Sequence, residues 1–156
     1  MKTKIISIFL IVLLAIPNMS YASASAQNNQ IIKEYIAQSD IFKDNIYYIA
    51  ELVIGAQLSK QELQENQRRI DQQLKDIVGL QKQIEEYNNT LNYGSVDSRN
   101  ATMLLIVTHF YKNAYDELLI YMNSDDKTVR FEALERFYYD MNTAAQKLDW
   151  LERLIS

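Results

Sequence analysis

Few residues in this chain are of the types that usually perform chemistry. The sequence has no cysteine and a single histidine, His109. The absence of thiols excludes disulfides, zinc-thiolate sites and cysteine nucleophiles. On a helix, the neighbours of His109 on the same face would be Leu105, Lys112 and Asp116. The main apolar stripe of that helix lies on other positions, so His109 is predicted to be a surface residue. A haem-binding bundle is an alternative, with His109 paired to one of three methionines, Met103, Met122 or Met141.

Acidic residues come in adjacent pairs at positions 85–86, 116–117 and 125–126. Adjacent side chains on a helix point about 100° apart, so the members of a pair do not converge on one atom. The spaced acidic loop that binds calcium is absent, as is any sequence context for a serine nucleophile. We therefore predict no catalytic site, no metal site and no cofactor, and a protein that is not an enzyme.

Tyrosine and glutamine carry the remaining candidate sites. Three tyrosines occupy seam positions and are predicted to be core residues: Tyr111, Tyr121 and Tyr138. Tyr48 and Tyr139 lie off the main seams, where tyrosine often anchors a protein partner. Gln67 and Gln81 occupy alternate seam positions of a heptad pattern, where polar residues can fix self-association. These four residues are the predicted partner-binding residues.

The elements that would position these residues are helices. Apolar residues recur at steps of three and four over 30–54 and 59–91, and again on either side of the polar stretch 123–127. Before that stretch, the predicted apolar seam of the third helix is Leu104, Val107, Tyr111, Ala114, Leu118 and Tyr121. Residues 92–100 contain Gly94 and several small polar residues, which predicts a loop. The expected fold is all-α, an antiparallel four-helix bundle joined by short loops.

Gly55 and a capping pattern at Ser59 and Glu62 predict a break between the first two helices. The apolar register nevertheless continues across this point. The alternative is therefore one long helix over about 30–91 with a C-terminal helical hairpin folded against it. For the last helix, which should end near Leu154, the predicted inward stripe is Phe131, Leu134, Tyr138, Met141, Ala145 and Leu148, with Phe137, Ala144, Leu151 and Leu154 beside it.

The N-terminal segment has the three parts of a secretory signal. Lys2 and Lys4 precede an apolar run of residues 5–16, which is short of the ~20 residues that span a bilayer. Small residues at 22, 24 and 26 offer cleavage sites. We predict a signal peptide over 1–24, with cleavage between 22 and 26, and a single helical domain over 27–156. The mature chain is expected to be periplasmic or secreted and to lack a stable membrane span.

The predicted mature domain is acidic. Removing Lys2 and Lys4 from 16 basic residues leaves 14 against 20 acidic residues, a formal charge of −6. This charge excludes nucleic acid as an expected partner. We therefore predict a protein that acts in protein–protein interaction or assembly outside the cytoplasm, as an accessory subunit of a cell-envelope apparatus. A small-molecule or haem carrier is the alternative, and a membrane-acting toxin a weaker one.

Overall fold

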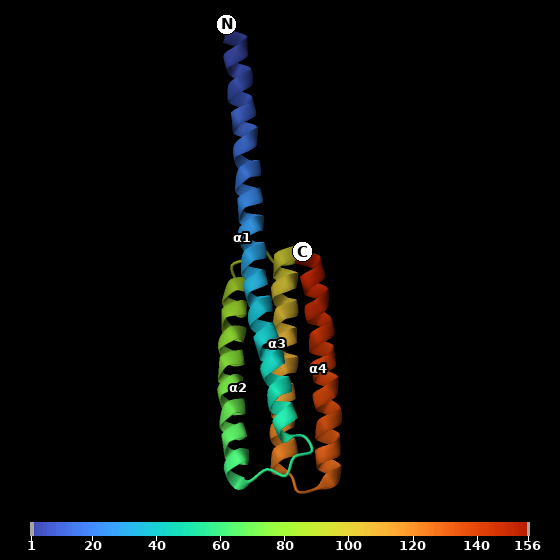
Figure 1. Ribbon diagram of the computed structural model, residues 1–156. Helices are drawn as coiled ribbons and strands as arrows, with labels where there is room; N and C mark the ends of the chain where they lie inside the picture. Colours follow the sequence, from blue (N-terminus) through green and yellow to red (C-terminus); the bar gives the residue numbers. More distant parts are fainter. Residues whose placement is uncertain (1, 156) are drawn as a thin grey trace.

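The computed structural model describes the backbone of residues 2–155 and the side chains of residues 27–155. Four helices follow one another: α1 (Lys2–Val53), α2 (Lys60–Asn88), α3 (Val96–Asn123) and α4 (Lys127–Ile155). Consecutive helices run antiparallel, and the described part of the chain contains no strand (Figure 1). The prediction of an all-α four-helix bundle is thus confirmed.

The chain reverses between α1 and α2, so the alternative of one continuous helix over 30–91 is wrong. Gly55 has φ +77°, a backbone conformation that disfavours any residue with a Cβ. The Gly55 amide donates a hydrogen bond of 3.1 Å to the hydroxyl of Tyr121. At the start of α2, Ser59 Oγ accepts from the Glu62 amide at 3.3 Å, and Glu62 Oε2 accepts from the Ser59 amide at 2.8 Å. The predicted capping box is present, and it starts a new helix at this point, so the apolar spacing that continues in the sequence does not form one helix.

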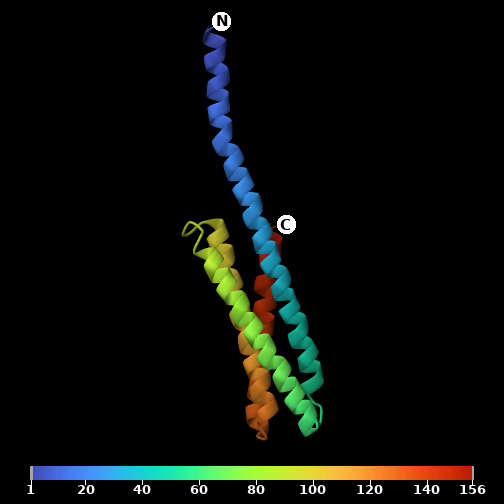
Figure 2. The same cartoon turned by 90° about the vertical axis from the view of Figure 1, so that its left-hand side faces the viewer.

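Two helix boundaries differ from those predicted. α1 begins at Lys2, not near residue 30, and its N-terminal part projects beyond the bundle (Figures 1 and 2). Residues 2–24 of the predicted signal segment 1–24 lie in this projecting part, and the side chains of that segment lie outside the described residues. α3 begins at Val96, because the Ser95 hydroxyl accepts a hydrogen bond of 3.1 Å from the Ser98 amide and caps the helix. The predicted loop over 92–100 was therefore too long.

α3 occupies the centre of the bundle. It contacts α1, α2 and α4, whereas no contact joins α2 to α4 within the described chain. The apolar seam predicted for this helix is buried, and its largest fully buried side chains are Tyr111, Tyr115, Leu104 and Leu118. α3 thus forms the core against which the other three helices pack.

The inward face of α4 differs from the predicted stripe. Phe131 and Tyr138 are 62% and 50% exposed, and Leu154 is also exposed. The buried face is formed by Ala133, Phe137, Asp140, Met141, Ala144, Leu148 and Leu151. It contains Met141 and Leu148 from the predicted stripe, and Phe137, Ala144 and Leu151 from the positions predicted beside it. The centre of the stripe was therefore predicted too far toward the exposed residues Phe131 and Tyr138.

Candidate functional site

The structure places the four predicted partner-binding residues in two kinds of environment. Tyr48 and Tyr139 are exposed, whereas Gln67 and Gln81 are half-buried on α2. Gln67 Nε2 donates to Asn123 Oδ1 of α3 at 3.0 Å, so this side chain joins two helices of the same chain. Gln81 Nε2 is buried and has no hydrogen-bond partner among the described residues. Self-association through α2 stays a prediction.

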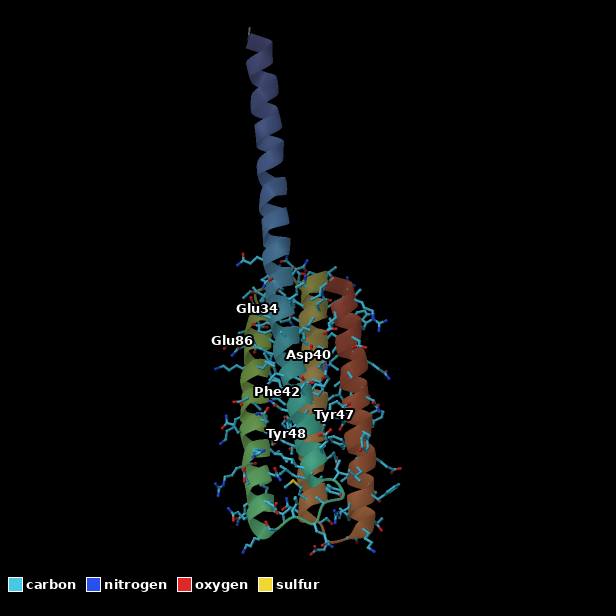
Figure 3. All side chains as sticks on the ribbon, in the orientation of Figure 1. Glu34, Asp40, Phe42, Tyr47, Tyr48 and Glu86 are labelled. Atoms are coloured by element: carbon cyan, nitrogen blue, oxygen red, sulfur yellow. The ribbon has the colours of Figure 1, made fainter. Side chains whose placement is uncertain are left out.

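Tyr48 lies on the side of α1 that faces α2 (Figure 3). The guanidinium of Arg69, from α2, lies 5.9 Å from the centre of the Tyr48 ring. Arg69 Nη1 also donates a long hydrogen bond of 3.5 Å to the Tyr48 hydroxyl. The two side chains line one surface pocket between α1 and α2. Tyr48 therefore already has a cationic partner within the chain.

Beneath this tyrosine, a small polar network crosses the bundle. Gln73 Oε1 accepts from Asn45 Nδ2 of α1 at 3.0 Å and from the Tyr115 hydroxyl of α3 at 3.3 Å. Tyr115 is fully buried, and this burial raises the pKa of its hydroxyl, with Asp76 adding to the shift. The network gives a buried hydroxyl an acceptor and ties three helices together. Its polar groups are satisfied from within the chain.

Tyr139 lies beside a second surface pocket, of about 520 Å³, which we call the α3–α4 pocket. Its ring is 66% exposed and packs edge-on against Phe110 of α3, with 6.4 Å between ring centres. The pocket is lined by three residues of α3 and three of α4: Asn113, Asp116, Glu117, Arg136, Tyr139 and Asp140. A single aromatic ring thus stands at the edge of a pocket that is otherwise polar and charged.

The carboxyl groups in the α3–α4 pocket are incompletely paired. Glu117 Oε1 accepts from Arg136 Nε at 2.8 Å, but Glu117 Oε2 is buried and has no hydrogen-bond partner among the described residues. Asp140 is only 8% exposed, and no described residue forms a hydrogen bond with it. Buried polar groups are normally hydrogen-bonded, because an unpaired one costs about 1–3 kcal/mol. Glu117 Oε2 is therefore a buried acceptor without a donor, whereas the carboxylate of Asp140 is not fully enclosed and faces the pocket without a donor from the described residues.

The surroundings of Asp140 raise the pKa of its carboxyl. Burial raises the pKa of its carboxyl to about 6, the negative charge of Glu117 adds to the rise, and Arg136 partly opposes it. Arg136 is itself shared between Glu117 and Glu132. Its charge is therefore not available to Asp140 alone, and the pocket retains an excess of negative charge.

Asp140 and Glu117 were missed by reasoning from sequence. Glu117 was assigned with its neighbour Asp116 to a solvated face, and Asp140 carried no prediction. A signal was nevertheless present, because Asp140 follows Phe137 by three residues and precedes Ala144 by four. A carboxylate at helical spacing within an apolar stripe indicates a buried charge, provided that the stripe is placed on the correct face.

The remaining candidates for chemistry lie apart from this pocket. His109 is exposed, and its Nδ1 lies 2.7 Å from the Leu105 carbonyl oxygen one helical turn earlier. Within the described residues, no three histidine, cysteine or acidic side chains are grouped so that they could hold a metal ion. No helix in that same part of the chain has a stretch long and apolar enough to cross a bilayer.

Comparison of the chain with models of protein families, with curated proteins and with solved structures found no match.

Proposed function

We propose that the protein acts outside the cytoplasm by binding another protein, as a non-enzymatic accessory subunit in an assembly of the cell envelope. The observation that carries this proposal is the exposure of large aromatic side chains on α4. Phe131, Tyr138, Tyr139 and Trp150 are each about half exposed or more, although they share one helix. Surface aromatics at this density are unusual for an outer face that meets only water.

The arrangement of these rings favours one contact surface over the others. Trp150 follows Tyr139 by three helical turns, so both rings lie on the same side of α4. We call these two residues the Tyr139–Trp150 row. Tyrosine and tryptophan are the residues that most often dominate binding energy at interfaces, because each buries a large area and keeps a polar group for hydrogen bonding. The row also borders the α3–α4 pocket, which offers polar contacts beside apolar ones.

The location outside the cytoplasm rests on the N-terminal sequence. Lys2, Lys4 and the apolar run that follows them have the order of a secretory signal, and small residues occur at the expected cleavage positions. The mass of the protein recovered from the periplasm or the medium tests this part. We expect the loss of 22 to 26 N-terminal residues, and an intact N-terminus would contradict it.

Site-specific photo-crosslinking in cells that express the chain with its own signal tests the interaction. Benzoylphenylalanine is introduced in place of Tyr139, of Trp150 or, as a control, of Asp71, which is exposed on the outer face of α2. We expect one protein to be crosslinked from positions 139 and 150 and not from 71. Equal labelling from all three positions, or none from 139 and 150, would overturn the proposal.

A further inference from the structure

The α3–α4 pocket contains acceptors for which the chain supplies no donor. Asp140 is more than nine-tenths buried, lines the pocket and has no hydrogen bond to any described residue. Glu117 Oε2, on the neighbouring helix, is buried and equally without a partner. These two observations are independent of each other and of the exposure of Tyr139. Both point to a positively charged hydrogen-bond donor that comes from outside the chain.

The chemistry of the pocket favours an organic cation over a metal ion. A hard metal ion needs several oxygen ligands around one point, and no such group of three acidic side chains occurs in the described residues. An ammonium or guanidinium group instead needs a few acceptors and gains from an adjacent aromatic ring. Tyr139 supplies that ring at the edge of the pocket, and most of it is exposed.

We propose that the α3–α4 pocket binds the cationic head of a lysine or arginine side chain contributed by the partner protein. Asp140 accepts its N–H groups, the negative charge of Glu117 attracts it, and the ring of Tyr139 packs against its cation or its aliphatic stem. This inference rests on the proposed function, because the Tyr139–Trp150 row brings the partner to the rim of the pocket. The formal charge of −6 on the predicted mature domain favours the approach of a basic partner surface.

The charged groups around Asp140 determine how binding depends on pH. Glu117 and Asp116 face the pocket from α3, and Arg136 faces it from α4. Lys112 is paired with Asp116 at 2.8 Å, and Arg136 is shared between Glu117 and Glu132, so neither of these two cations neutralises Asp140 fully. Asp140 therefore takes up a proton as the pH falls through about 6, and its ability to bind a cation is lost.

The test is a titration of the exported protein followed by backbone amide NMR. The probes are N-acetyl-arginine amide, N-acetyl-lysine amide and, as an uncharged isostere of arginine, N-acetyl-citrulline amide. We expect arginine or lysine to shift amides of residues 113–117 and 136–140, with citrulline without effect. Asp140→Asn should weaken this binding about tenfold or more, because a charge-assisted hydrogen bond is lost. Asp149→Asn, at an exposed position of the same helix, should leave it unchanged.

A second variant and a second pH keep the inference falsifiable. Glu117→Gln should also weaken the binding of arginine or lysine. Lowering the pH from about 7.5 to about 5 should weaken this binding in the parent protein, whereas the binding by Asp140→Asn should not weaken further. Binding of citrulline as strong as that of arginine, or equal losses in Asp140→Asn and Asp149→Asn, would overturn the proposal. Binding of the free amine agmatine without binding of the blocked amino acids would overturn the assignment to a protein side chain. Crosslinking from Tyr139 without any binding of these probes would leave the proposed function standing and remove this inference alone.

Discussion

Two pockets of the bundle each place an exposed tyrosine beside charged and polar side chains, yet they differ in how those groups are paired. At Tyr48, Arg69 lies over the ring, and Gln73 satisfies Asn45 and Tyr115 from within the chain. At Tyr139, Asp140 and one oxygen of Glu117 have no donor among the described residues. The first arrangement is complete without a ligand. The second costs stability, and it is the arrangement to which we assign the cation of a partner.

Gln73→Ala should have the largest effect on stability. The substitution removes the acceptor of two hydrogen bonds and leaves the buried Tyr115 hydroxyl unpaired, which should cost about 2 kcal/mol. Urea unfolding measures this loss. Gln72→Ala, at the neighbouring exposed position, is the matched control, although its amide donates to Asp76 at 2.8 Å. Equal losses for both variants would show that the network does not stabilise the fold.

Asp140→Asn should have a smaller effect of the opposite sign. The folded-state pKa of about 6 lies above the ordinary aspartate pKa of 3.8, so the folded protein favours the protonated carboxyl. This group therefore lowers stability as the pH rises from about 4 to about 6. At pH about 7 the variant should be more stable by about 1 kcal/mol, or 2–5 °C in Tm, and the difference should vanish below pH about 4. Thermal unfolding across this range measures it, and a gain that persists at low pH would contradict the assignment to Asp140.

Arg69→Ala should have the smallest effect. Arg69 is exposed, and contacts of an exposed cation with an aromatic ring or a carboxylate are weakened by solvent. We expect a loss of stability that is small beside that of Gln73→Ala and that decreases at high salt. Arg68→Ala is the control on the same helix. A loss as large as that of Gln73→Ala would mean that the Tyr48 pocket depends on its surface pair more than on its buried network.

The sequence allowed most of the architecture to be predicted, because local signals and packing agree there. The Ser59 and Glu62 cap and the seam of α3 were identified from spacing alone and are present in the structure. Tyr48 and Tyr139 were assigned to positions off the seams and are exposed. Tyr111 and Tyr121 were assigned to the core and are buried.

The predictions for α4 failed for an identifiable reason. Bulky residues occur on both sides of this helix, and the stripe predicted to face inward includes Tyr138, leaves Ala144 beside it and misses Ala133. Only the close approach of a neighbouring helix shows that the small residues face inward. Asp140 lies on that inward face, so the misplaced stripe also hid the carboxyl that defines the α3–α4 pocket.

The central position of α3 has a consequence for the order in which the chain folds. α3 and α4 are joined by a short turn and share the most extensive pairing in the bundle, so their contacts close over a short length of chain. Contacts of this kind form early, because little loop entropy is lost before they are made. We expect this hairpin to be the first cooperative unit, with α2 and α1 docking afterwards, side by side, onto a helix that is already in place. In native-state hydrogen exchange, the amides of α3 should then be the last to open.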